Sequence, residues 1–315
     1  MMKHRISRIA VAMTASVIAA NTCAQSSQFN IRIEKKAGYD QMLAYNNGVI
    51  PQTVRVWLNS STNTASGFPM PVERQVFPRS TVVLNEFRPA NPKQAFYYHY
   101  QYSLTHGDPS AVHDQNAKYL PPFFWPDARL INQAEDRLNN SHNSSENHFA
   151  LDIDLPMGTP VMAAREGVVV ANVKHFPDTG RLDRALNDQA NYVMILHGDG
   201  SFASYIHLKQ NSSALVAGQR IATGDLIGLS GNSGYSSGPH LHFDVQVNQR
   251  GKITSVPFRF WDPASGYYRP KTGTRVQAVK IIRGETGQHK PLKDCKKPGN
   301  LIDQDVLNCM RRNPQ

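Results

Sequence analysis

The stretch Gly238-Pro239-His240-Leu241-His242-Phe243 decides the architecture expected for this chain. Side chains two apart in a strand share a face, so His240 and His242 project into one cavity, about 6 to 7 Å apart at their bases. Upstream, His148-Phe149-Ala150-Leu151-Asp152 places another imidazole four residues before a carboxylate. Imidazole nitrogen and carboxylate oxygen are zinc ligands, and a catalytic site uses three protein ligands and leaves a fourth position for water. The two stretches together predict a zinc site on a β-sheet.

The path of the chain between His148 and Asp152 has two solutions. The two residues have the same parity in a strand, but a straight strand would separate them by roughly 13 Å. One metal ion cannot bridge that distance, because zinc–ligand bonds are only about 2 Å long. We therefore expect the chain to bend between them, or His148 to lie in a loop.

A third motif, Tyr205-Ile206-His207-Leu208, lies between these two stretches. Gly-Thr-Pro-Val-Met-Ala-Ala follows the first stretch at residues 158–164, and Gly-Asn-Ser-Gly precedes the last at residues 231–234. In this order the motifs resemble those of the lysostaphin/LytM-type zinc endopeptidases, over about residues 146–262. Ala150 is a departure, because that family usually has glycine there. Its methyl group can tighten the bend but removes no ligand.

The resemblance implies a role for each of five residues. His148, Asp152 and His242 are expected to bind zinc. His207 and His240 are expected to act on the bound water and the scissile peptide. Either histidine can take the proton of the water or stabilise the oxyanion and leaving amine, so the identity of the general base stays open.

Residues beside these motifs are candidates for supporting roles. Ligand imidazoles usually donate their second N–H to a carboxylate or carbonyl. Asp154 and Asp244 each lie two residues beyond a ligand and suit that role, with a solvent-facing position as the alternative. The polar insertion Lys174–Ala190 has the length of a substrate wall or lid. The candidate substrate contacts are Tyr205, Asn232 and Ser233.

Residues 1–24 have the pattern of a secretory signal peptide. Lys3, Arg5 and Arg8 precede an apolar run at residues 9–20, and Thr22-Cys23-Ala24 resembles a cleavage site. The apolar run is too short to span a bilayer comfortably. We therefore expect an exported protein, periplasmic or secreted, with no integral membrane segment after signal removal.

Charge and cysteine content agree with export. The 315-residue chain has a net charge of +10, which falls to +7 without residues 1–24. A basic exported protein without nucleic-acid motifs is suited to an anionic envelope polymer, although a solvated basic surface explains the same balance. After cleavage only Cys295 and Cys309 remain. An oxidising compartment favours a disulfide between them.

The strand patterns predict an all-β chain with two domains. Residues 25–127 are expected to form an antiparallel β-sandwich that resembles an immunoglobulin-like domain, because residues 53–58 and 96–104 alternate in polarity. The aromatic face of residues 96–104 is interpreted as core, with a glycan-stacking surface as the alternative. Residues 147–265 are expected to form the antiparallel catalytic domain, since no helical period occurs there. Residues 266–315 are expected to be a basic tail.

Residues 128–146 are predicted to be a connecting loop between the two domains. The loop carries His142 within a polar stretch. We interpret His142 as an exposed loop histidine, with a surrogate metal ligand or a substrate contact as the alternatives.

These features predict a zinc-dependent endopeptidase that hydrolyses peptide cross-links of bacterial cell-wall peptidoglycan, with peptide stems as its partners. One alternative is a non-enzymatic activator of a cell-wall amidase, as in family members that have lost ligands. The complete set His148, Asp152 and His242 argues against that alternative. Another is a secreted protease for Gly-rich proteins. The loops that would select the cross-link carry no pattern that identifies it.

Overall fold

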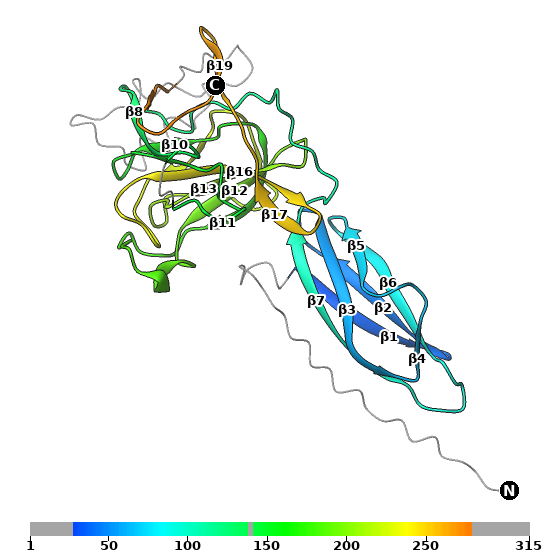
Figure 1. Cartoon of the computed structure of the whole chain (residues 1–315). Coiled ribbons are helices and arrows are strands. Elements are labelled where there is room, and N and C mark those ends of the chain that lie inside the picture. Colours follow the sequence, from blue (N-terminus) through cyan, green and yellow to red (C-terminus); the bar gives the residue numbers. More distant parts are fainter. Residues whose placement is uncertain (1–27, 138–140, 279–315) are drawn as a thin grey trace, which may run out of the picture.

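The computed structural model describes residues 28–137 and 141–278. They form two β-sheet bodies that follow one another along the chain (Figure 1). Within the described part the only helical element is a single 3₁₀ turn, η1 (Arg184–Leu186). The all-β expectation is confirmed. Nowhere in these two stretches does a helix have the length and apolar character needed to cross a membrane.

The smaller body is a sandwich of two antiparallel sheets. One sheet has the order β1 (Phe29–Lys36), β2 (Tyr39–Asn46), β6 (Ser80–Pro89), β4 (Thr64–Ser66). The other has the order β5 (Val72–Val76), β3 (Gln52–Thr62), β7 (Tyr97–His106). Met42 and Leu84 of the first sheet share a core with Val54 and Tyr98 of the second. The aromatic face of β7 packs against this core, so its interpretation as core is confirmed.

The larger body is built on one broad antiparallel sheet. Its order is β14 (Arg220–Ile221), β11 (Gly167–Val173), β12 (Tyr192–Leu196), β13 (Phe202–Ile206), β16 (Leu241–Gln249), β9 (Leu151–Ile153), β8 (Arg129–Gln133), β20 (Arg275–Val276), and β17 (Lys252–Ser255) also pairs with β16. Two small sheets flank it, β10 (Pro160–Met162) with β15 (Leu226–Leu229) and β18 (Phe260–Asp262) with β19 (Gly266–Tyr268).

The central strand β16 separates the hydrophobic core from the polar face. Leu241, Phe243 and Val245 alternate along the strand and pack into the core. The residues between them point to the opposite face, as the period of two requires. These are polar, yet His242 and Asp244 are buried as well. Buried polar groups need partners, so this face of the sheet is where a site is expected.

The larger body extends past both of its expected boundaries. β8 lies in the predicted connecting loop, and β20 lies in the predicted tail, but both are strands of the central sheet. Residues 107–127, expected in the sandwich, instead run along the larger body, where Tyr119 and Phe123 enter its core. The reason is burial: Ile131 and Tyr119 are completely inaccessible, and they reach that state only against the larger core.

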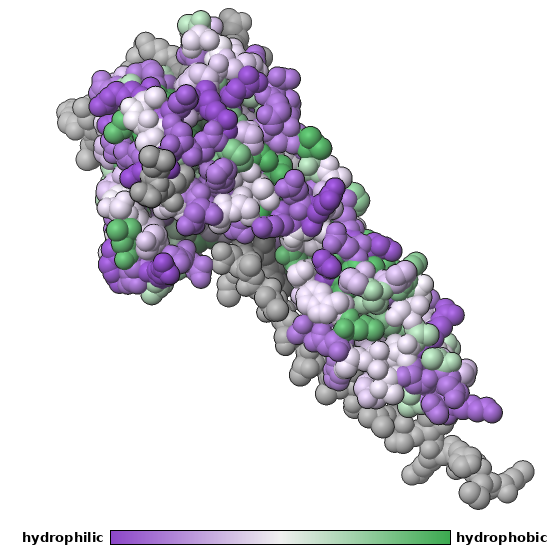
Figure 2. Space-filling model, viewed as in Figure 1, coloured by the Kyte–Doolittle hydropathy of each residue, from purple (hydrophilic) through white to green (hydrophobic). Residues whose placement is uncertain are grey.

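A small set of contacts joins the two bodies. The Asn248 amide donates to the Thr53 hydroxyl and to the Gly107 carbonyl, both at 3.2 Å. Phe202 packs with Ile50 and Val170 across the joint. Figure 2 shows a mostly hydrophilic surface over the larger body, with apolar patches on the sandwich. The joint lies at the Gln249 end of β16, whereas His242 lies near its other end.

Candidate metal centre and active site

Strand pairing brings Asp152 and His242 together. The two residues are cross-strand partners of β9 and β16, so their side chains leave the same face of the sheet side by side. The His242 Nδ1 lies 3.0 Å from the Asp152 Oδ1. The predicted pairing of a carboxylate from the first motif with the second histidine of the last motif is therefore present in the structure.

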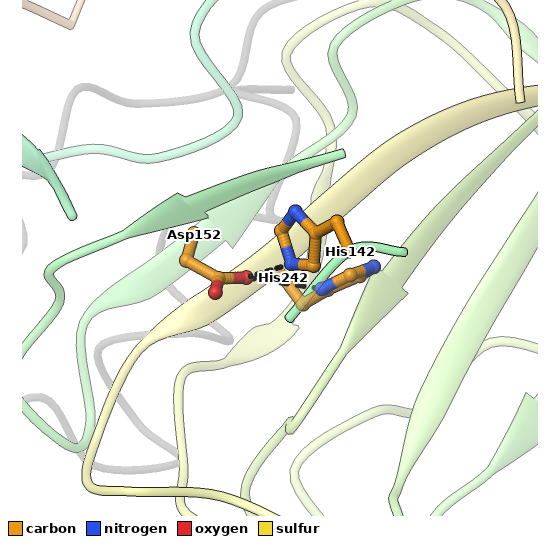
Figure 3. A group of neighbouring side chains, drawn as sticks. All are labelled: His142, Asp152 and His242. Atoms are coloured by element: carbon orange, nitrogen blue, oxygen red, sulfur yellow. Dashed lines mark hydrogen bonds and ion pairs between the residues drawn. The ribbon is translucent and has the colours of Figure 1, made fainter. Parts of the chain in front are cut away.

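The third member of the group is His142. Its Nε2 lies 3.2 Å from the Asp152 Oδ1, and its ring meets the His242 ring edge-on, with centroids 4.8 Å apart. The candidate ligand atoms of His142, Asp152 and His242 all lie within 4.8 Å of one another (Figure 3). The interpretation of His142 as an exposed loop histidine is wrong, because only 4% of its surface is accessible.

His148 lies outside this group. It is exposed, and its ring packs edge-on against Phe149 with centroids 4.7 Å apart. Residues 144–149 form turns that precede β9, so His148 lies in a loop, which is one of the two solutions expected for this segment. The structure thus places His142, and not His148, beside Asp152 and His242.

The group has the donor chemistry of a catalytic zinc site. Two imidazoles and one carboxylate are a recurrent three-ligand set for catalytic zinc, and they leave a fourth position for water. Three imidazole nitrogens, including the His240 Nε2 at 3.7 Å, surround the single oxygen Oδ1 of Asp152. A cation suits that cluster because it satisfies the carboxylate and the imidazole lone pairs together. The residues present therefore fit zinc.

Electrostatics within the group keep Asp152 charged. Burial would raise the pKa of the Asp152 carboxyl, but its hydrogen bonds with His142 and His242 hold that pKa well below its usual value. For His242, burial acts to lower the pKa, and the contacts with Asp152 and Asp244 outweigh it and raise the pKa to about 10. The Asp244 Oδ2 lies 3.5 Å from the His242 Nε2, so Asp244 is placed to orient this ring.

Two further histidines border the group. The ring centroids of His207 and His240 are 4.5 Å apart, and those of His207 and His242 are 6.2 Å apart. The His207 Nδ1 donates to the Ser233 carbonyl at 2.7 Å, and the His240 Nδ1 donates to the Gly238 carbonyl at 2.8 Å. A carbonyl can only accept, so Nδ1 carries a proton in both rings, and in a neutral ring Nε2 is then the acceptor.

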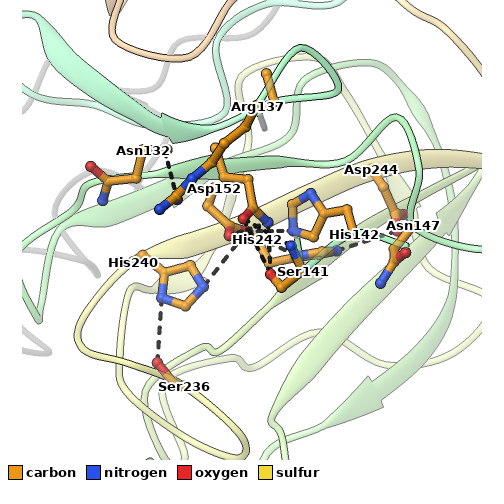
Figure 4. Close-up of polar contacts among 12 residues, drawn as sticks. Asn132, Arg137, Ser141, His142, Asn147, Asp152, Ser236, His240, His242 and Asp244 are labelled. Atoms are coloured by element: carbon orange, nitrogen blue, oxygen red, sulfur yellow. Dashed lines mark hydrogen bonds and ion pairs between the residues drawn. The ribbon is translucent and has the colours of Figure 1, made fainter. Parts of the chain in front are cut away.

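The environments of these two histidines differ. Burial, reinforced by the neighbouring His240 and His242, lowers the pKa of His207 to about 3. His240 also approaches the Ser236 hydroxyl, at 3.3 Å (Figure 4). Its Nε2 is the atom that lies 3.7 Å from Asp152, so this ring is aimed at the candidate metal group.

The three candidate substrate contacts have different surroundings. Tyr205 is completely buried, and its hydroxyl accepts from the Ala164 N–H at 2.8 Å, which corrects the expected substrate contact to a core position. Ser233 is also inaccessible and holds the chain through the Asn191 N–H and the Leu208 carbonyl. Asn232 remains partly exposed beside the site loop.

The insertion Lys174–Ala190 packs on that loop. The Gly180 N–H donates to the Asn232 carbonyl at 2.6 Å, and the Asn232 side chain donates back to the Gly180 carbonyl at 3.1 Å. Arg181 forms an isolated parallel bridge with Tyr235. The insertion and the loop therefore form one continuous wall beside His207 and His240. Cys295, Cys309 and residues 1–24 lie outside the described residues.

The sheet carries the His-Asp-His group as a candidate metal site on its polar face. Residues 146–253, about a third of the chain, match the family model described as peptidase family M23. His142 lies before that segment, and therefore the family motif gives no signal for it. Two features of the sequence could have indicated His142 as a site residue: it lies ten residues before Asp152, and it lies in a polar loop.

Curated relatives match the same region. The chain is 41% identical over 104 residues to the peptidoglycan DD-endopeptidase ShyA of Vibrio cholerae. The matched segment covers 33% of this chain and 21% of ShyA. The chain is 35% identical over 101 residues to the DD-carboxypeptidase/endopeptidase Mpg of Neisseria meningitidis serogroup B, which covers 32% and 20%. The matched segments thus span about a fifth of the length of these two relatives.

A solved structure of a zinc-containing peptidase from Vibrio cholerae is also similar. It has a TM-score of 0.32 and 18% sequence identity, and it covers 69% of this chain and 55% of that one.

Proposed function

We propose that this protein is a zinc-dependent endopeptidase that hydrolyses peptide cross-links of bacterial cell-wall peptidoglycan. The observation that carries the proposal is the buried group His142, Asp152 and His242, with His207 and His240 at its border. The names of the two curated relatives, both endopeptidases and one of them a peptidoglycan enzyme, support this substrate class.

In this proposal His142, Asp152 and His242 hold the zinc ion, and His142 takes the role first expected of His148. Zinc bound there would lower the pKa of a water molecule to about 7 and polarise the scissile carbonyl. Asp244 holds the Nε2–H of His242, which leaves Nδ1 of that ring facing Asp152 and the metal position. The fixed tautomer is what ligand histidines need from a second carboxylate.

His240 and His207 carry out the proton transfers. The Nδ1–H of His240 is held by the Gly238 carbonyl, so in the neutral ring Nε2 is the proton acceptor, and this atom faces Asp152 at 3.7 Å. We assign the acceptance of the water proton to this atom, and Asp152 then stabilises the imidazolium that forms. Delivery of the same proton to the leaving amine completes hydrolysis. His207, anchored by its Nδ1–H on the Ser233 carbonyl, presents Nε2 as an acceptor for a hydrogen bond from the attacking water.

The wall formed by Lys174–Ala190 and the loop Asn232–Gly238 is proposed to bind the peptide stem beside these histidines. We further propose that residues 1–24 direct export to the periplasm or beyond, that Cys295 and Cys309 form a disulfide, and that the sandwich is a separate domain. An amidase activator without activity of its own fits less well, because the donor set is complete.

The test is the release of soluble muropeptides from purified sacculi, with zinc and after chelation. The matched variants are His240→Ala and His99→Ala, because His99 is an exposed histidine of β7 in the sandwich. We expect zinc-dependent release of un-cross-linked peptides by the wild type and by His99→Ala, and loss of release in His240→Ala. Zinc binding without release by the wild type would contradict the proposal.

A further inference from the structure

Gln133 connects the candidate metal group to a strand that the family match does not include. It lies at the end of β8, and only 3% of its surface is accessible. The matched segment begins at residue 146. Burial of a polar amide costs free energy unless the amide is hydrogen-bonded, so the hydrogen-bond partners of Gln133 indicate its role.

A β-bulge aims this side chain at Asp152. β8 and β9 pair through Ile131 with Ile153 and then through Gln133 with Asp152, with a register shift between the two pairs. Asn132 is the extra residue, and it is exposed. In a regular ladder Asn132 would face Asp152. Bulges of this kind re-aim side chains next to active sites, and here the bulge puts a buried amide where an exposed one would have been.

The amide is used at both of its ends. The Gln133 Nε2 lies 3.2 Å from the Asp152 Oδ2 and 2.8 Å from the Ser141 hydroxyl, and its Oε1 accepts from the Ser141 N–H at 3.2 Å. The carboxylate can only accept and the backbone N–H can only donate, so the orientation of the amide is fixed. One side chain thus holds Asp152 and also the residue that precedes His142.

The two oxygens of Asp152 have separate partners. Oδ1 faces the nitrogens of His142, His240 and His242, whereas Oδ2 accepts from the Gln133 amide. The amide therefore fixes the rotation of the carboxylate, and with it the oxygen that is offered to the histidines. Groups that orient ligands in this way contribute to metal affinity without touching the metal.

We infer that Gln133 is a positioning residue of the metal centre, which sets the orientation of Asp152 and the place of His142 together. The inference rests on the proposed function, because it assumes that this group binds zinc. Its consequence is that one substitution on β8 weakens two ligands at the same time.

The test is the zinc affinity of the full chain, measured by competition with a chromophoric chelator. Gln133→Met keeps the length of the side chain and removes both hydrogen-bonding ends. We expect it to weaken zinc binding about 10- to 100-fold, as substitutions of ligand-orienting groups do. The control is Gln277→Met, the same exchange at an exposed glutamine that donates to the Pro126 carbonyl. We expect no change there.

Two further measurements separate positioning from stability. Ser141→Ala leaves the Gln133–Asp152 contact in place and removes only a hydroxyl, so we expect a loss of only a few-fold, as for one neutral hydrogen bond. In the cobalt-substituted protein, the visible ligand-field spectrum of Gln133→Met should shift, and that of Ser141→Ala should not. If Gln133→Met fails to fold, Gln133→Asn replaces it; its amide is too short to reach both partners, and the same loss is expected.

Zinc affinity within twofold of wild type, with only the melting temperature of the metal-free protein lowered, would overturn the inference and make Gln133 purely structural. A wild-type chain that binds no zinc would instead overturn the proposed function, so the two failures are distinguishable.

Discussion

Replacing His142 with alanine should remove zinc binding, whereas replacing His148 should not. The two histidines lie six positions apart in the same polar segment, yet one is buried against Asp152 and the other is exposed. The two variants therefore compare the metal ligand indicated by contact with Asp152, His142, with the metal ligand indicated by the HxxxD spacing, His148.

The size of the effect follows from the number of ligands. Zinc binding by four-ligand sites is worth about 10–16 kcal/mol, or about 2.5–4 kcal/mol per ligand, which corresponds to a roughly 60- to 700-fold weaker affinity when one ligand is lost. At free zinc 1,000 times the wild-type Kd, zinc stabilises the wild type by about 4.1 kcal/mol. A variant with a 100-fold weaker affinity keeps about 1.4 kcal/mol of that stabilisation.

The assays are chelator competition for the Kd and thermal unfolding with and without zinc for the stabilisation. His142→Ala should lose most of the zinc-dependent shift in Tm, and His148→Ala should keep the wild-type shift. The opposite outcome, in which His148→Ala loses zinc and His142→Ala keeps it, would refute the reasoning from burial and contact. The spacing of the HxxxD motif would then identify the ligand.

Three other outcomes are expected. Tyr205→Phe should destabilise the fold by about 1–3 kcal/mol in urea unfolding, because the buried N–H of Ala164 loses its acceptor. Gly107→Ala should lower the free energy of unfolding by about 1–3 kcal/mol from backbone strain alone, because Gly107 has a φ of +88°. The new Cβ would also lie 2.7 Å from the Phe202 ring. Faster limited proteolysis at the joint between the two bodies would detect this destabilisation. Burial lowers the pKa of His197 to about 4, so between pH 6.5 and 4 the unfolded chain binds a proton that the folded chain does not. As the pH falls from 6.5 to 4, the free energy of unfolding should therefore decrease by about 3 kcal/mol. In His197→Phe, a plot of the free energy of unfolding against pH should lack this decrease.

The part of the site that lies on regular strands was predictable from sequence. The period of two predicts His240 and His242 on one face, and the structure places His240 directly before the first residue of β16. The partnership of His242 with Asp152 needed more, because it depends on the register of β9 against β16, and register is set by the packing of both strands. The resemblance to a known family supplied that pairing where the physical pattern could not.

The loop residues of the site were not predictable in the same way. His142 reaches Asp152 through irregular chain, and no periodicity governs the direction of a side chain there. Gln133 depends on a bulge, which changes the facing residue from Asn132 without leaving a signal in the residue types. The expected boundaries missed β8 and β20 for a related reason, since short strands of this kind are defined by their neighbours more than by their own pattern.

β8 and β20, which the expected boundaries missed, both stabilise the position of Asp152 in the candidate metal centre. The Ile131 N–H donates to the Thr274 carbonyl, and the Gly273 N–H donates to the Ile131 carbonyl, so residues 273–276 hold β8 from its outer side. β9 holds its inner side, and the bulge between them directs Gln133 onto Asp152. A fragment cut at the limits of the family match, residues 146–253, would therefore keep Asp152 and both histidines of the last motif but lose His142 and the strand that orients the carboxylate. We therefore expect the site to need the chain from β8 to β20, with a metal affinity that depends on residues on both sides of the matched segment.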